Sequence, residues 1–189
     1  MTLTKSDVAR RQLVTAIRLF FSNGDPVSVY TLASNAWEVI DELCRLRGVD
    51  SASDQTRTHL DAPKDLKKNY INAPYRNFFK HANKDPDGKV TDFDAVSSEG
   101  VLFLAAEDYT RLNKKSPIEM QVYSYWFCAK YPEKLSPSAT ELLTSKLQTA
   151  FPGIADAERT AQLAMGSRAI AGAIKDPTVM NDPRTEQSL

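Results

Sequence analysis

The stretch Asp25–Gly48, DPVSVYTLASNAWEVIDELCRLRG, decides the fold class of this chain. Its apolar residues recur at the three- and four-residue spacing of an α-helix and form one broad stripe: Val29, Leu32, Ala33, Ala36, Trp37, Ile40, Leu43 and Cys44. Pro26 suits the first turn of a helix, Arg45 and Arg47 suit its C-terminal dipole, and Gly48 suits its end. The stretch therefore predicts a long amphipathic helix.

The segment before it predicts a second helix of the same kind. Residues 4–7, TKSD, can cap a helix, and apolar residues then follow at near-helical spacing: Val8, Leu13, Ile17, Phe20 and Phe21. Asn23 and Gly24 form a stop signal between the two helices. We expect the two helices to pack as an antiparallel pair.

The middle of the chain is less regular. Residues 49–63 lose all periodicity and predict a loop, and short helices are expected over 64–71 and 75–82. Residues 85–88, DPDG, predict a turn, because Asp, Pro and Gly are typical turn residues. Residues 89–93 are the one plausible strand.

The C-terminal half predicts further helices. A long one starts at Asp94, and two capping boxes, SPIE at 116–119 and SATE at 138–141, open the next two. The last helix covers about 155–175 and is rich in alanine and glycine, and 176–189 is expected to be a disordered tail. Together these signals predict an all-α, single-domain bundle over residues 1–175, with about seven helices and at most one short strand or hairpin.

Bulk composition limits the classes of function. The chain has 189 residues, 42% hydrophobic and 25% charged, with a formal net charge of zero. No field of the whole molecule draws it onto nucleic acid or an anionic membrane, so any such binding needs a local patch. Cys44 and Cys128 lie far apart on apolar faces and are expected to be buried thiols in a reducing compartment. No secretory signal or membrane-spanning run is visible, so the expected location is the cytoplasm, without membrane contact.

Charge is unevenly distributed along residues 57–94. Basic residues dominate the first part: Arg57, Lys64, Lys67, Lys68, Arg76, Lys80 and Lys84. Acidic residues dominate from 85 to 108: Asp85, Asp87, Asp92, Asp94, Glu99, Glu107 and Asp108. Such a segment either binds a charged partner, RNA or protein, or pairs with itself. As binding residues we select Lys67, Lys68, Lys80 and Lys84.

The hexapeptide RNFFKH at 76–81 lies in the basic part. Arg76 and His81 are five residues apart on an expected helix, and Asn77 follows the arginine. This pattern resembles the catalytic motif of the HEPN superfamily of small helical proteins. The resemblance implies a metal-independent endoribonuclease or toxin-like protein with Arg76, Asn77 and His81 as catalytic residues, composed across a homodimer. The same superfamily also contains non-catalytic interaction domains.

The chemistry of these residue types suits RNA cleavage. Histidine can move the proton of a 2′-hydroxyl near neutral pH, and the planar fork of arginine matches phosphate oxygens. The alternative is structural: His81 would end a helix and satisfy its carbonyl groups, while Phe78 and Phe79 would anchor the core.

The following residues suggest a calcium loop as a second alternative. Positions 1, 3, 5, 7, 9 and 12 of an EF-hand-like loop would be filled by Asn83, Asp85, Asp87, Lys89, Thr91 and Asp94. Pro86 disfavours the helical conformation that the loop needs at the preceding residue. A plain turn over residues 85–88 explains the same residues.

A wider resemblance joins the motif to another part of the chain. NFFKHA at 77–82, DPD at 85–87 and DPVS at 25–28 are similar to a family of uncharacterised bacterial proteins, which implies no known activity. No glycine cluster, zinc spacing or nucleophile elbow is present, so no cofactor is expected. We interpret the chain as a non-catalytic helical interaction or regulatory module, with the ribonuclease as the alternative.

Overall fold

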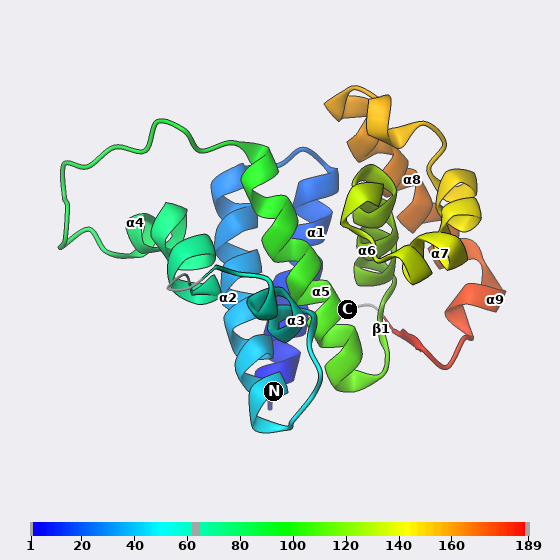
Figure 1. Ribbon diagram of the computed structural model, residues 1–189, viewed down its shortest axis with the longest axis horizontal. Coiled ribbons are helices and arrows are strands. Elements are labelled where there is room, and N and C mark those ends of the chain that lie inside the picture. The colour runs from blue at the N-terminus through cyan, green and yellow to red at the C-terminus, as the bar shows by residue number, and fades with distance from the viewer. Residues whose placement is uncertain (1, 62–64, 188–189) are drawn as a thin grey trace.

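The two N-terminal helices lie side by side in the computed structural model, which describes residues 2–61 and 65–187 (Figure 1). Helices α1 (Lys5–Phe21) and α2 (Pro26–Leu46) run antiparallel across a short turn, as predicted. Thr4 and Asp7 form a reciprocal capping box at α1, and the Asp25 carboxylate accepts the Ser28 N–H at 2.8 Å at α2. The all-α class is confirmed.

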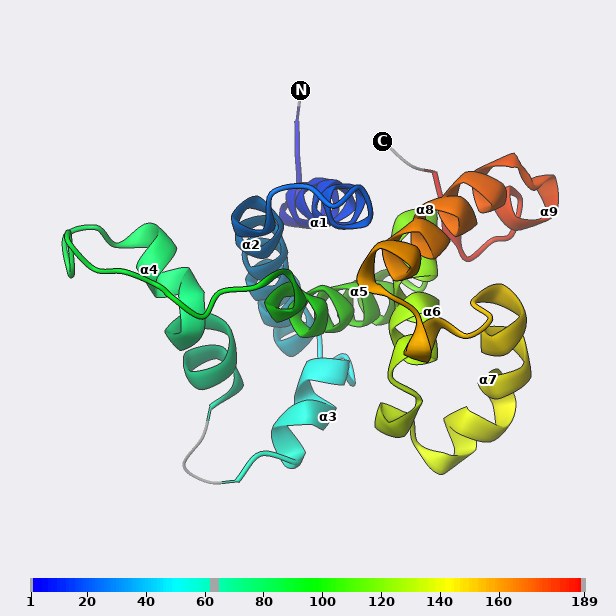
Figure 2. The same ribbon diagram turned by 90° about the horizontal axis from the view of Figure 1, so that it is seen from above.

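Helices α5 (Glu99–Asn113) and α6 (Ile118–Lys130) complete the core with this pair (Figures 1 and 2). Phe20 and Phe21 of α1 meet Tyr123 and Trp126 of α6, with ring centroids 5.3–5.7 Å apart. Each ring removes a large apolar area from water, so this cluster is a major source of stability.

Helix α8 (Arg159–Lys175) packs against α1 and α6 at a glycine. A Cβ atom at Gly166 would lie 2.0 Å from Cε1 of Phe21. The alanine- and glycine-rich face predicted for this helix therefore brings its backbone close to an aromatic ring. Helix α7 (Pro137–Ala150) lies between α6 and α8 in the chain, flanked by the 3₁₀ turns η3 (Pro132–Lys134) and η4 (Ile154–Asp156). It begins slightly earlier than predicted, with Ser136 as its cap.

The predicted loop over 49–63 contains a helix. Helix α3 (Ala52–Thr58) starts at a local cap, where the Ser51 hydroxyl accepts the Asp54 N–H at 2.9 Å, and the buried Asp108 carboxylate accepts the N–H groups of Ala52 and Ser53 at 2.7 and 3.2 Å. Helix N-termini carry unsatisfied N–H groups, and here a residue from α5 satisfies two of them. Residues 62 and 63 lie outside the described ranges.

The two short helices expected at 64–71 and 75–82 are one continuous winding. A π-helix, η1 (Leu66–Arg76), runs directly into α4 (Asn77–Lys80). Proline cannot continue a regular α-helical ladder, and the chain around Pro74 adopts the wider π winding instead of breaking. Lys64 lies outside the described ranges.

The strand expected at 89–93 is absent among the described residues, which follow an irregular path there before the 3₁₀ turn η2 (Ala95–Ser98). The strands that do form, β1 (Ser116–Pro117) and β2 (Thr185–Glu186), pair in parallel, Ser116 with Thr185. Ser116 therefore belongs to a strand, and α6 starts without a side-chain cap, contrary to the predicted capping box.

The C-terminal segment differs from the expected disordered tail over its described part, residues 176–187. It forms helix α9 (Pro177–Met180) and β2. Glu186 accepts hydrogen bonds from Arg10 and Tyr109, both at 2.8 Å, which tie the segment to α1 and α5. Residues 188 and 189 lie outside the described ranges.

None of the helices in the described part of the chain is both long and apolar enough to cross a membrane. Cys44 is buried, as predicted, and Cys128 is half-buried; both are free thiols.

Candidate functional site

Residues 65–94 form an arm that stands out beside α2 (Figures 1 and 2). The arm consists of η1, α4 and the loop 81–94, which extends away from the bundle before it returns to α5. Every candidate site residue predicted from the sequence lies on it.

Arg76 is buried at the base of the arm, with 7% of the residue exposed. Its guanidinium forms an ion pair with Glu38 of α2 and donates to Asn35 at 3.0 Å and Asn72 at 3.1 Å. Both terminal nitrogens therefore already have partners, and a carboxylate neutralises the charge. In this geometry Arg76 joins the arm to the bundle.

Glu38 receives a second cation from the arm. The Lys67 ammonium lies 2.6 Å from its carboxylate. Burial by itself would raise the pKa of Glu38, but hydrogen bonds from Lys67 and Arg76 outweigh burial and lower this pKa. Of the four lysines predicted to bind a partner, Lys67 is thus engaged within the chain, whereas Lys68, Lys80 and Lys84 are exposed to solvent.

Asn77 and His81 lie at the two ends of α4. Asn77 is exposed, and its carbonyl accepts the backbone N–H of His81 at 3.1 Å. His81 ends the helix, as the structural alternative predicts, and is half-buried. No hydrogen bond joins its ring to another residue of the described ranges, so the ring satisfies no carbonyl group and is not hydrogen-bonded to Arg76.

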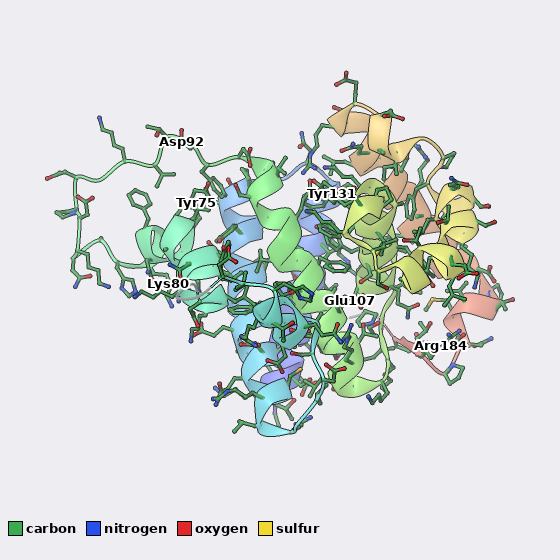
Figure 3. All side chains as sticks on the ribbon, in the orientation of Figure 1. Tyr75, Lys80, Asp92, Glu107, Tyr131 and Arg184 are labelled. Carbon is green, nitrogen blue, oxygen red and sulfur yellow. The ribbon has the colours of Figure 1, made fainter. Side chains whose placement is uncertain are left out.

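An aromatic cluster fixes the arm next to the ion pair. The ring of Tyr30, in α2, lies at about right angles to those of Tyr75, Phe79 and Phe93, at 5.4–6.0 Å between centroids. Tyr75 also donates its hydroxyl to the carbonyl of Asp92 at 3.2 Å, which ties η1 to the returning loop (Figure 3). Edge-to-face contacts of this kind add stability beyond the area they bury. Phe79 is therefore an anchor, as the structural alternative predicts.

The outward side of the arm carries two further aromatic side chains. Tyr70 is 43% exposed and Phe78 is 41% exposed. They are eight residues apart, which is close to two turns of a helix that changes from π to α winding. Lys68 and Lys80 are also exposed in this winding, and Lys80 projects from α4 in Figure 3.

The loop shows no calcium-site geometry. Asp94, the twelfth position of the predicted calcium loop, caps η2 by accepting the N–H and the hydroxyl of Ser97, both at 2.9 Å. Gly88 donates its N–H to the Asp85 carbonyl at 3.3 Å, which is the turn expected from DPDG. The other predicted ligands, Asn83, Asp87, Lys89 and Thr91, are exposed. Among the residues described, no group of three or more His, Cys, Asp or Glu could hold a metal ion.

The sequence did not single out the buried charges of the bundle. Glu99 is 2% exposed and binds Lys130 at 2.9 Å, Arg159 and the Tyr131 hydroxyl at 2.7 Å. Glu119 is fully buried and forms a 2.6 Å ion pair with Arg18. Buried charges are costly unless paired, so these carboxylates join helices and have structural roles.

Asp108 is a third buried carboxyl group of the bundle. It is fully buried and accepts the Ser53 hydroxyl at 2.5 Å in addition to the two N–H groups of α3, and Ser53 in turn accepts Trp37 Nε1 at 2.8 Å. Burial raises the pKa of Asp108 to about 6, although its hydrogen bonds act in the opposite direction. Its place on the apolar stripe of α5, three residues after Ala105, is the sequence signal that could have identified it.

Comparison of the chain with protein-family models, with curated proteins and with solved structures finds no match. The resemblances to the HEPN superfamily and to the bacterial family therefore stay predictions.

Proposed function

We propose that the protein is a non-catalytic helical interaction module that presents the outward side of its arm to a protein partner. The observation that carries this proposal is the pair of exposed aromatic side chains, Tyr70 and Phe78, on an arm whose base is anchored. Exposed aromatic side chains next to charged ones are typical of the residues that dominate binding energy at protein interfaces.

The anchoring at the base supports the same proposal. Arg76, Phe79 and Phe93 all bind the arm to α2, so the outward residues are held in place before any partner arrives. Pre-organised surfaces bind more tightly because less conformational entropy is lost on association.

The burial of Arg76 weighs against the ribonuclease alternative. Stabilising a phosphorane requires a cation that can reach phosphate oxygens. Here the guanidinium already binds Glu38, Asn35 and Asn72, and a substrate would have to displace all three.

Photo-cross-linking tests the proposal. Benzoylphenylalanine replaces Phe78 in one variant and, as a matched control, Tyr125, which is 43% exposed on α6. We expect irradiation of cells to give one discrete protein adduct from position 78 and none from position 125. Equal labelling from both positions, or none from position 78, would contradict the proposal, and an adduct removed by ribonuclease would identify RNA as the partner instead.

A cleavage assay separates the module from the enzyme. Purified chain incubated with single-stranded RNA is expected to leave the RNA intact. Cleavage that is lost in His81→Ala but kept in His59→Ala, the variant of the other histidine, would support the ribonuclease.

A further inference from the structure

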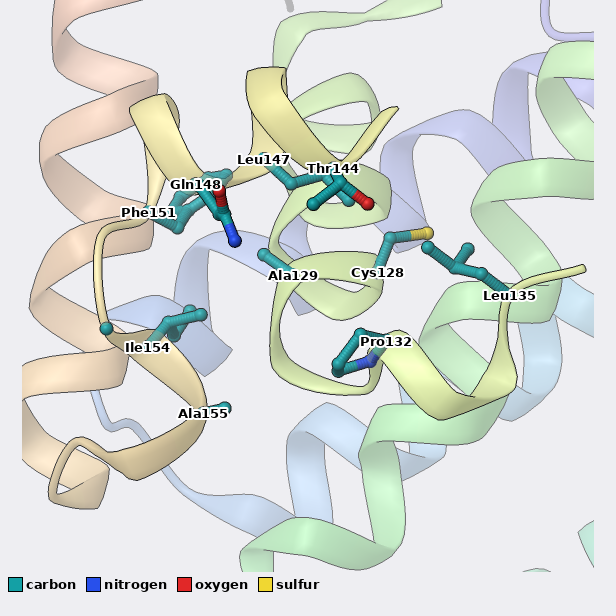
Figure 4. Close-up of a pocket in the computed structure, with 11 residues that line it drawn as sticks. Cys128, Ala129, Pro132, Leu135, Thr144, Leu147, Gln148, Phe151, Ile154 and Ala155 are labelled. Atoms are coloured by element: carbon teal, nitrogen blue, oxygen red, sulfur yellow. The ribbon is translucent and has the colours of Figure 1, made fainter. Parts of the chain in front are cut away.

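A cavity of about 200 Å³ lies beneath α7, between that helix, the end of α6 and the turns η3 and η4 (Figure 4). Leu147 and Phe151 form its α7 side and Ile154 the η4 side, and all three are buried. Cys128 and Ala129 of α6 face them across the cavity (Figure 4).

Among the described residues, eleven line this cavity, and none of them is charged. The larger groove beside α2 and α3 differs in its charge, because nine of the twelve described residues that line this 730 Å³ space are charged. A cavity without charged groups offers nothing to compensate the desolvation of an ionic ligand.

Few polar groups in the cavity remain for a ligand. The Thr144 hydroxyl donates to the Thr140 carbonyl at 2.6 Å, and burial raises the pKa of the Cys128 thiol to about 12, so the thiol is neutral. The Gln148 amide is left as the group able to make one directional hydrogen bond with a ligand.

The volume limits the size of the ligand. An apolar cavity of about 150 Å³ in another protein binds benzene, and drug-sized ligands occupy pockets from about 300 Å³ upward. We propose that the cavity beneath α7 is a binding site for a small, neutral, mainly apolar molecule of the size of one or two fused rings. This site is separate from the arm and does not depend on the function proposed for it.

Indole titrated into the full chain tests the site by calorimetry. We expect saturable binding with a Kd between roughly 10 μM and 1 mM, the range open to a ligand of this size. Indole-3-acetate, which adds a negative charge, is expected to bind at least ten-fold more weakly. No saturable binding of indole, or equal binding of both compounds, would overturn the proposal.

Two variants in which leucine replaces an alanine test where indole binds. Ala129→Leu fills the cavity, whereas Ala171→Leu adds the same side chain on the exposed face of α8. The first is expected to weaken indole binding at least ten-fold and the second to leave it unchanged. Unchanged binding in a folded Ala129→Leu would place indole elsewhere and overturn the proposal.

Cys128, on the cavity wall, allows a measurement on the natural chain. This measurement tests the proposal even if the Ala129→Leu variant does not fold. Cys128 is half-buried and Cys44 fully buried, so N-ethylmaleimide should react at Cys128 before Cys44, and slowly, because the raised pKa of Cys128 leaves little thiolate. Saturating indole is expected to slow this reaction at least five-fold. An unchanged rate would overturn the proposal.

Discussion

The bundle and the arm differ in where their charged side chains lie: several are buried and paired in the bundle, whereas most are exposed in the arm. In the bundle, Glu99, Asp108 and Glu119 are at most 2% exposed, and each is held by groups from another helix or turn. In the arm, Lys68, Lys80 and Lys84 are exposed, and so are the acidic residues of its loop. The bundle therefore uses charge to fix helices together, while the arm leaves most of its charge available to a partner.

The two regions also differ in how they are held. The bundle has a continuous apolar core, to which the arm contributes Leu66 and Ile71. The rest of the arm is held by the ion pairs of Arg76 and Lys67 with Glu38 and by one aromatic cluster around Tyr30. Regions with few buried contacts open at lower free-energy cost than a core. Changes in the bundle should thus affect the whole fold, and changes in the arm should stay local.

Removing the buried charge of Asp108 should have the largest effect on how stability depends on pH. Its pKa is raised in the folded state, from 3.8 to about 6, so the folded state binds the proton more tightly in that window. The contribution of this group is greatest below pH 3.8 and is lost as the pH rises through 6. Between pH 4 and 7 we expect the wild-type free energy of unfolding to fall by about 2.5 kcal/mol relative to Asp108→Asn.

Denaturant unfolding of both proteins across this pH range measures the difference. Asp156→Asn, at an exposed position, controls for the loss of one negative charge. If the free energy of unfolding depended on pH in the same way in wild type and in Asp108→Asn, burial of this carboxyl group would have no net cost.

Two glycines of α8 give a matched test of core packing. Gly166→Ala places a methyl group against Phe21 and should lower the free energy of unfolding by about 2 kcal/mol. At Gly172 the added methyl group would meet no described atom within 4 Å beyond its chain neighbours and the backbone of its own helix, so Gly172→Ala should raise stability by up to about 1 kcal/mol. Thermal and denaturant unfolding of the two variants decides the point, and equal stability of both would mean that Phe21 moves aside freely.

The smallest effect on the whole fold is expected from the base of the arm. Arg76→Ala removes the ion pair with Glu38 and the bonds to Asn35 and Asn72. The free energy needed to open the arm should fall by about 1 kcal/mol or slightly more, while the melting temperature of the whole chain changes little. Amide hydrogen exchange should accelerate over residues 66–80 and not in α1 or α6.

Two further variants sharpen this comparison. Lys68→Ala, at an exposed position of η1, should leave exchange unchanged. Arg76→Lys keeps the charge but lacks the planar fork, so it should behave more like Arg76→Ala than like wild type. A large fall in global stability of Arg76→Ala would show that the arm and the bundle unfold as one unit.

The helices with a clear apolar stripe were predictable from the sequence, and those made by distant partners were not. The caps and stripe of α1 and α2 are local patterns, and the structure confirms them. Helix α3 has a local cap, Ser51, but Asp108 satisfies its first N–H groups, and strand β2 pairs with Ser116. Asp108 and Ser116 both lie far away in the chain from these elements, outside any short window of sequence. The same holds for Arg76, whose partner Glu38 lies on another helix.

The sequence by itself determined the all-α class and drew attention to the charged, aromatic stretch that became the arm. Periodicity and capping act over a few residues, and for that reason they can be read from the chain directly. Only the tertiary structure decided that Arg76 and Phe79 face α2 while Tyr70 and Phe78 face outward. It also brought α6 and α7 together around an uncharged cavity. Which side of a helix meets which neighbour depends on contacts between distant segments, and these exist only once the chain has folded.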